Sequence, residues 1–179
     1  MGLNIIYTEV VMPTRELPAQ APDFTLDHVL GHSVSLADFR GRTVAVIFGG
    51  KESAPQIREG VGIIRRRFDP DELPVVGVSD LRDAPRAVRV IVKNQLKKAF
   101  EEALRDEAKS IEAAGKPPRA DPKKDVNMLL DWKGETVDAF GLTGVENEAV
   151  GVLVDGDGRI LGSGSGAQLG PEILALMPA

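Results

Sequence analysis

The residues best placed to do chemistry lie in the short stretch Lys51–Gln56, which reads KESAPQ. It follows the apolar run Val44–Phe48, whose β-branched and aromatic residues are typical of a buried strand. Apolar residues with helical spacing come next, at Ile57, Val61, Ile64 and Phe68. A turn from a strand into a helix N-terminus presents free N–H donors and the positive end of the helix dipole. The stretch could therefore hold an anion or a reactive side chain.

Ser53 is the hydroxyl of this stretch, and we consider two roles for it. With Gln56 three residues later it forms a capping-box pattern, in which the serine accepts a backbone N–H of the first helical turn and the glutamine reaches back. A nucleophilic serine would need a general base. The two histidines, His28 and His32, belong to an earlier hairpin. The pattern therefore predicts a helix cap rather than a catalytic serine.

No metal or cofactor is predicted. His28 and His32 have an i, i+4 spacing, but their surroundings indicate strand and turn, and Asp27 is the nearby carboxylate. We expect them to be polar loop residues. The run Asp155–Gly158, DGDG, resembles the start of a calcium loop but lacks its third acidic position and its closing glutamate. It predicts a tight turn.

Composition narrows the function classes. The 179 residues are 42% hydrophobic and 27% charged, as in an ordinary globular protein, and contain no cysteine. A net charge of −5 gives no reason to expect a nucleic-acid partner. No stretch approaches the ~20 apolar residues of a membrane span. The first residues show neither a basic region nor a long apolar one, so we expect no signal peptide and a cytoplasmic location.

Buried-strand patterns alternate with amphipathic patterns, which predicts an α/β fold. The expected strands are Asn4–Met12, Phe24–Leu26, Val34–Leu36, Val44–Phe48, Leu73–Ser79, Val126–Leu130, Val150–Val154 and Ile160–Leu161. Short helices are expected at Glu135–Phe140 and Glu172–Met177, a polar linker at Lys116–Lys124 and a flexible segment at Gly162–Gly166.

The helical pattern over residues 83–114 is longer than the ~30 Å diameter of a small domain. With Asp83 as its cap it would measure about 45 Å, so part of it must project, bend or pack on a partner. Lysine and arginine dominate its first half, and acidic residues its second half, against the helix dipole. Two interpretations remain open: a solvated face, or antiparallel pairing between two copies of the chain.

Three runs, in order, resemble the redoxin group of the thioredoxin-like superfamily, which comprises thioredoxin-like reductases and peroxiredoxins. They are Ala21–Leu26 with Val34–Phe48, Asp131–Leu142, and Gly151–Ile160. The match extends over about residues 20–177. The resemblance implies a thioredoxin-like fold: a central mixed sheet with helices on both faces, extended here by the long helix after the second core strand. It implies an N-terminal extension at 1–20 and a redoxin domain at 21–179 with a helical insertion at about 83–124.

The thiols of that group are missing. The C-x-x-C of the reductases would fall on Ser53–Gln56, with Pro55 still third, and the peroxiredoxin cysteine motif is absent. The family's cis-proline, or the arginine of peroxiredoxins, would fall on Ala149. Thiol chemistry needs a thiolate, so this chain cannot perform it.

We therefore expect a redox-inactive thioredoxin-like protein that binds a protein or peptide in a structural or regulatory role, as a homo-oligomer. The resemblance implies that extended chains are held beside the thiol position through backbone hydrogen bonds. The expected recognition patch is Lys51, Glu52, Ser53, Ala54, Pro55, Gln56, Glu148 and Ala149. The long helix at 83–114 is a second candidate, for self-association. The alternative is a small-molecule or anion binder, or a non-thiol enzyme, that uses the helix N-terminus at Ser53. An enclosed cavity near Ser53 would favour a small ligand, and an open groove would favour a peptide.

Overall fold

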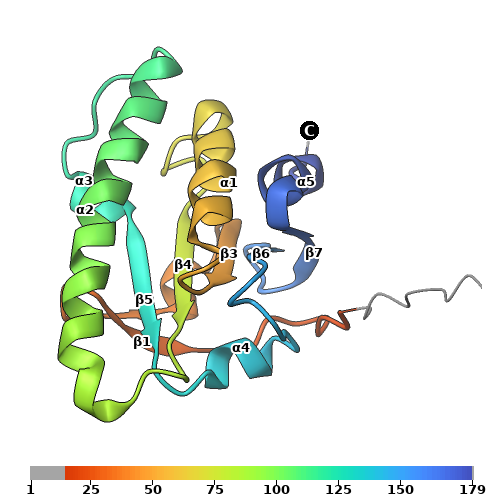
Figure 1. Ribbon diagram of the computed structural model, residues 1–179. Helices are drawn as coiled ribbons and strands as arrows, with labels where there is room; N and C mark the ends of the chain where they lie inside the picture. The colour runs from red at the N-terminus through yellow and green to blue at the C-terminus, as the bar shows by residue number, and fades with distance from the viewer. Residues whose placement is uncertain (1–14, 179) are drawn as a thin grey trace, which may run out of the picture.

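The computed structural model describes residues 15–178 of the chain, which form a mixed sheet of seven strands covered by helices (Figure 1). The strand expected at Asn4–Met12 lies outside the described residues. The strands are β1 (Thr25–His28), β2 (Ser33–Ser35), β3 (Val44–Gly49), β4 (Val75–Asp80), β5 (Asn127–Asp131), β6 (Val150–Val154) and β7 (Ile160–Ser165).

The sheet has the order β2-β1-β5-β4-β3-β6-β7. The three central strands β5, β4 and β3 run parallel, and β6, β7 and the β1–β2 hairpin add antiparallel pairs. Strand β3 is buried along its whole length, as a central strand covered on both faces must be. The predicted α/β class and mixed sheet are confirmed.

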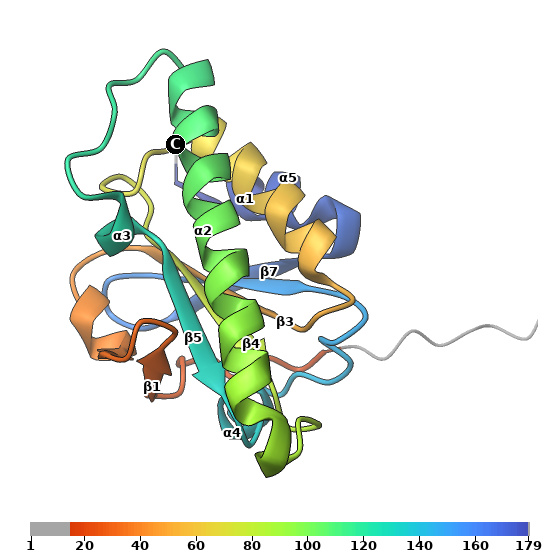
Figure 2. The ribbon, with the colours of Figure 1, turned by 60° about the vertical axis from the view of Figure 1, so that its left-hand side comes forward.

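Helices cover both faces of the sheet, as Figure 2 also shows. They are α1 (Ala54–Arg67), α2 (Arg89–Ala113), α3 (Pro122–Asp125), α4 (Glu135–Ala139) and α5 (Leu169–Leu176), with short 3-10 turns at Leu36–Phe39, Arg86–Val88 and Gly166–Gln168. Helices α1, α2 and α5 lie on one side and α4 on the other (Figure 1). None of the helices between residues 15 and 178 is long and apolar enough to cross a membrane.

Strand alternation divides the core between these two sides. In β3, Val44, Val46 and Phe48 face the α4 side and pack with Phe140. Ala45 and Ile47 face the other side, where they pack with residues of α1 and α5. A third cluster joins Phe100 of α2 to the β1 and β5 region.

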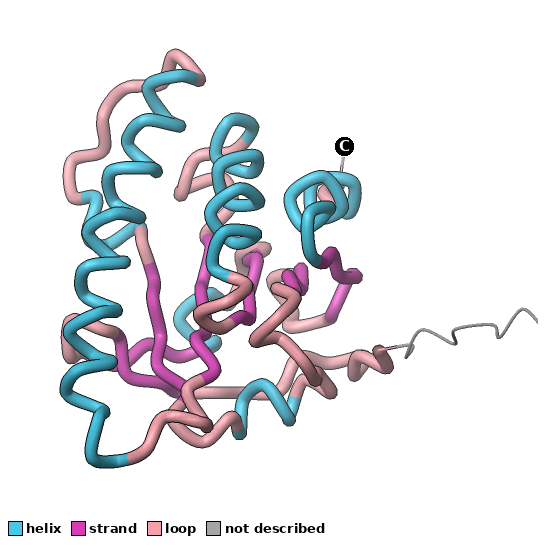
Figure 3. Tube along the Cα trace, in the orientation of Figure 1, coloured by secondary structure: helices cyan, strands magenta, loops and turns pink. Residues whose placement is uncertain are grey.

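The long helix differs from its prediction at its start. Asp83 does not cap it: Pro85 adopts an extended conformation with ψ 147°, a single 3-10 turn follows, and α2 begins at Arg89. Its 25 residues measure about 37 Å. The C-terminal turns extend past the ends of the strands (Figure 3).

The prediction of a flexible segment at Gly162–Gly166 is wrong, because most of it belongs to β7. Its backbone pairs with β6, with Gly164 opposite Gly151. A side chain at Gly164 would collide with the backbone carbonyl of Leu169 and the side chain of Glu172. The small residues therefore let α5 lie against this strand, which the sequence alone could not indicate.

Candidate functional site

The junction between β3 and α1 lies where the sequence places it, but its chemistry differs. Ser53 precedes the first helical residue, with φ −87° and ψ −2°, and makes no capping hydrogen bond. Its hydroxyl instead accepts the Gly50 N–H at 2.9 Å and lies 2.7 Å from the Val145 carbonyl oxygen, to which it donates. The predicted capping box is therefore wrong: a loop distant in sequence competes for the hydroxyl.

Gln56 also bonds to that distant loop rather than to its own helix. Its Oε1 accepts the Ala149 N–H at 2.9 Å, and its Nε2 donates to the Asn147 carbonyl at 3.4 Å. The Ala149 carbonyl accepts the Gly166 N–H at 2.9 Å. Both backbone groups of Ala149 are thus already partnered within the chain.

The loop closes over the turn. The Glu146 side chain lies directly against Gly50, and a side chain at this position would displace its carboxylate. Ser53 and Ala149 are completely buried. The other six residues of the expected patch stay at least partly accessible: Lys51, Glu52, Ala54, Pro55, Gln56 and Glu148. The structure brings all eight together, but it removes the Ser53 hydroxyl and the Ala149 backbone from the accessible surface.

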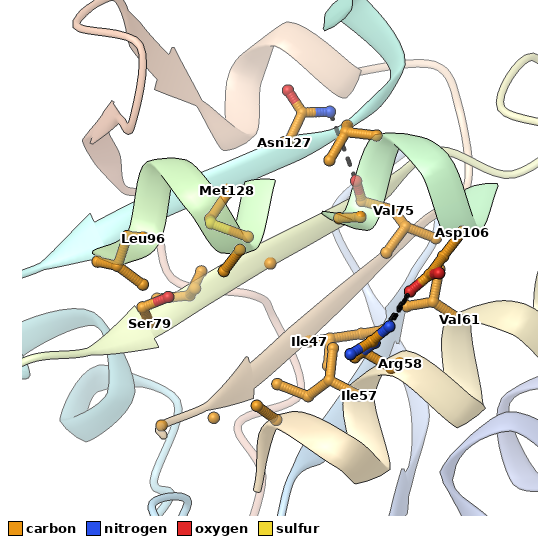
Figure 4. A pocket seen from close by; sticks show the side chains of 18 of the residues that line it. Ile47, Ile57, Arg58, Val61, Val75, Ser79, Leu96, Asp106, Asn127 and Met128 are labelled. Carbon is orange, nitrogen blue, oxygen red and sulfur yellow. Dashed lines mark hydrogen bonds and ion pairs between the residues drawn. The ribbon is translucent and has the colours of Figure 1, made fainter. Parts of the chain in front are cut away.

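A pocket that the sequence did not indicate begins at the same turn. It has a volume of about 950 Å³ and lies between α1, α2 and the strands β3, β4 and β5 (Figure 4). Val75, Gly77 and Ser79 form its floor, because alternate residues of a strand point to the same face. One end includes Gly49–Lys51 and Ala54, and the other includes Arg65 and Asn127.

Small residues account for this space. Gly77 contributes no side chain to the floor, and Ala99 and Ala103 of α2 lie in the wall. Gly62 of α1 faces Ser110 across the two helices. The pocket is partly open to the surface, so water or a ligand can enter it.

Ion pairs join the two helices beside the pocket. Arg58 of α1 contacts Asp106 of α2 at 2.7 Å, as the dashed line in Figure 4 marks, and Glu102 at 3.5 Å. Arg65 contacts Glu107 at 2.6 Å, with side-chain exposures of 1% and 10%. Burial raises the pKa of the Glu107 carboxyl, and Arg65 opposes that shift.

These pairs explain two features of the charge distribution. Arg65, in the last turn of α1, is fully buried, unlike its neighbours Arg66 and Arg67. Three acidic residues of the second half of α2 find their partners on α1 of the same chain. That part of the charge pattern therefore needs no second copy to explain it.

The two histidines are not a polar loop pair either. His28 is fully buried, stacks on His32 with 4.3 Å between ring centroids, and meets the edge of Phe100. Its Nδ1 accepts the Leu30 N–H, so its Nε2 carries the proton and donates to the Val126 carbonyl. Burial lowers the pKa of His28. Across residues 15–178 no group of three or more His, Cys, Asp or Glu residues is arranged to hold a metal ion.

No protein-family model matches this chain, and no curated protein matches its sequence. Solved structures do match. An exposed lipoprotein thioredoxin of Streptococcus pneumoniae superposes with a TM-score of 0.58 at 17% identity, over 87% of this chain and 100% of that one.

The thioredoxin domain of a thiol–disulfide oxidoreductase from Bacteroides vulgatus gives a TM-score of 0.54 at 20% identity, over 91% and 99% of the two chains. The fold is thioredoxin-like. A peroxidoxin of Mycobacterium tuberculosis matches at 0.56 and 18% identity, over 90% and 95%. The resemblance to redoxins is thereby confirmed for the fold, in a thioredoxin-like chain that has no cysteine.

The pocket is the part of the site that sequence reasoning missed. Its signal was present in α2, where Val92, Leu96, Ala99, Ala103 and Ser110 recur on one face. The residues become smaller along the helix, and that trend indicates a wall that does not fill the space beneath it.

Proposed function

We propose that this thioredoxin-like chain is a redox-inactive binding protein. The observation that carries the proposal is Ser53, which the sequence resemblance assigns to the position of the first reductase cysteine. Its hydroxyl is buried and bonded to the Val145 carbonyl, and the chain has no cysteine to replace it. Thiol–disulfide exchange and thiol peroxidase chemistry both begin with an accessible thiolate.

The binding site of the proposal is the pocket between α1 and α2. An extended peptide held at the 145–149 loop would need free backbone groups, and those of Ala149 are already partnered. The pocket has a largely apolar wall and a volume within the ~300–1,000 Å³ range of ligand sites. Lys51 and Ala54 of the expected patch line one end of the pocket, which supports the small-molecule alternative over a peptide at this loop.

Activity assays test the first half of the proposal. Insulin-disulfide reduction and hydrogen peroxide consumption are measured with the purified full chain and with Ser53→Ala. The expected result is no saturable turnover from either protein. Turnover by the parent chain that Ser53→Ala abolishes would overturn the proposal, because the serine would then be acting chemically.

A second candidate is a protein partner bound by the first half of α2. Val90 and Ile91 are 73% and 58% exposed, and the exposed cations Arg86, Lys97 and Lys98 lie nearby in sequence. Adjoining apolar residues with a charged rim are typical of an interaction surface. The partner of this proposal is an acidic protein surface in the cytoplasm, or a second copy of the chain.

Sedimentation distinguishes self-association from binding of a different protein. The full chain and Ile91→Asp are compared by analytical ultracentrifugation over a concentration series. A dimer that Ile91→Asp dissociates supports self-association through this surface. A parent chain that stays monomeric at all concentrations overturns self-association. In that case, a protein that co-purifies with the parent chain from the cytoplasmic fraction, but not with Ile91→Asp, supports a different protein partner.

A further inference from the structure

We propose that residues 105–125 form a hinged wall, which swings away from α1 and widens the end of the pocket that contains Arg65. This hinged wall comprises the part of α2 after Leu104, the loop that follows it and α3 (Figure 2). Asp106, Glu107 and other residues of the hinged wall line that end of the pocket, so its movement changes access from the solvent. The motion belongs to the fold and is independent of what the pocket binds.

The first part of α2 is anchored by apolar packing. Phe100 is completely buried and forms a core cluster with Val29 and Leu130, against which Leu104 packs. No residue of α2 beyond Leu104 belongs to any of the three core clusters that residues 15–178 form. Ile111 is buried, but outside those clusters. The anchored part therefore supplies the pivot, and little apolar contact holds the part beyond it.

Ion pairs hold the hinged wall against α1 instead. Arg58 contacts Asp106 at 2.7 Å, and the two side chains are 56% and 39% exposed. Exposed pairs of this kind contribute little to stability and are screened by salt. Arg65 and Glu107 form the inner pair at 2.6 Å. Their separation returns both charges to water, and the regained hydration offsets the loss of their attraction.

Two further features of this contact favour opening. The Arg65 Nη2 is buried and has no hydrogen-bond acceptor within residues 15–178. An unpartnered buried donor is unfavourable, and water can reach it once Arg65 and Glu107 separate. The helices also meet through small residues, because Gly62 has no side chain and a Cβ at that position would lie 3.9 Å from the Ser110 Oγ.

The loop after α2 is held by charges as well. Lys116 contacts Glu72 at 2.6 Å, and Arg119 donates two hydrogen bonds of 2.7 and 2.9 Å to the Asp71 carboxylate. All of residues 115–124 are exposed except these two cations. The loop is therefore held electrostatically against the acidic turn before β4, and salt should loosen it.

Hydrogen exchange tests the hinged wall. Amide exchange of the full chain is followed by mass spectrometry at low and at high salt, about 0.05 M and about 1 M NaCl. We expect amides in residues 105–125 to exchange at least about threefold faster at high salt, because opening becomes more frequent. Amides of β3 and of the first part of α2 should change less than about twofold.

A removable lock distinguishes opening of the hinged wall from fraying of the helix end. The chain has no cysteine, so Gly62→Cys/Ser110→Cys places its only two thiols on either side of the contact. The oxidised variant should lose the salt effect, and the reduced variant should regain it. Lys116→Gln/Arg119→Gln should accelerate exchange of the hinged wall about threefold or more at low salt. Lys123→Gln, at an exposed position in α3, is the matched control and should leave exchange unchanged.

Three results would overturn the inference. Exchange of the hinged wall that does not depend on salt would mean that packing holds it closed. A salt effect that persists equally in the oxidised variant would mean that the end of α2 frays in place. Exchange that rises equally in β3 would mean that the whole chain unfolds. None of these results bears on the proposed redox inactivity, which the turnover assays judge separately.

Discussion

Two regions that share the start of α1 have opposite physical character. At the turn before the helix, Ser53 and Gln56 form hydrogen bonds with the 145–149 loop, and the hydroxyl position is closed. Beside it, the pocket between α1 and α2 contains small residues and apolar walls. The comparison teaches that a residue at a position where chemistry is expected can be structural, while the space that a ligand could occupy lies beside it, between α1 and α2.

The largest effect is expected at the buried ion pair beside the pocket. Glu107→Ala leaves the Arg65 guanidinium buried without its counter-ion and should lower the free energy of unfolding by about 3–5 kcal/mol. Arg65→Met/Glu107→Leu leaves no unpaired charge and should cost less, about 1–3 kcal/mol, from the lost hydrogen bond to the buried Leu73 carbonyl. Urea denaturation measures both. The exposed Lys124–Asp121 pair provides the control, and Asp121→Ala should cost less than about 1 kcal/mol.

A similar test applies to the closed turn. Ser53→Ala removes the partner of the Gly50 N–H and the Val145 carbonyl and should cost about 1–3 kcal/mol in urea denaturation. Ser33 donates a longer bond of 3.2 Å at the surface, so Ser33→Ala should change stability little. A Ser53→Ala protein as stable as the parent would contradict the view that this turn is held from within.

Filling the pocket should raise the free energy of unfolding rather than lower it. Ala103→Leu adds apolar surface where space exists and should raise the free energy of unfolding by about 0.5–2 kcal/mol. Ala108→Leu, which adds the same group to an exposed position, measures the effect of helix propensity alone. Destabilisation by Ala103→Leu relative to Ala108→Leu would mean that this part of the wall is already packed.

Acid should affect the packing of α2 against β1 more than the turn before α1. His28 packs on Phe100 of α2, and burial lowers its pKa below the ordinary value of 6.5. The unfolded chain therefore binds more protons at this position, so its contribution to stability is complete above about pH 6.5 and is lost as the pH falls through the lowered folded pKa.

Urea denaturation between pH 8 and 5 measures this dependence. Stability should decline towards pH 5 in the parent chain and decline less in His28→Gln. The hydrogen bonds of the turn use serine, glutamine and backbone groups, which do not titrate in this range. An unchanged pH profile in His28→Gln would contradict the assignment of a neutral, buried imidazole.

Local patterns were sufficient for most of the sheet and for the position of the site. The β-branched run at Val44–Phe48 and the helical spacing after Pro55 located the junction between β3 and α1. The Asp155–Gly158 turn between β6 and β7 followed from its composition, as did the β1–β2 hairpin from the glycine between its strands. Such features are determined by residues only a few positions apart, so they can be predicted from local sequence patterns.

The remaining features depend on contacts between distant segments. Ser53 meets Val145 across 92 positions, and Arg65 meets Glu107 across 42. These separations explain why the capping box was a wrong prediction and why the sequence did not indicate the buried ion pair. The pairing of β7 with β6 likewise turned a glycine–serine segment into a strand.

By itself, the sequence determined that this thioredoxin-like chain has no sulfur nucleophile, because composition is independent of conformation. It also determined the order of strands and helices, because apolar periodicity follows from local backbone geometry. Only the tertiary structure decided that the Ser53 hydroxyl is enclosed and that a pocket lies between α1 and α2. Accessibility and unfilled volume depend on how segments far apart in the sequence pack against one another.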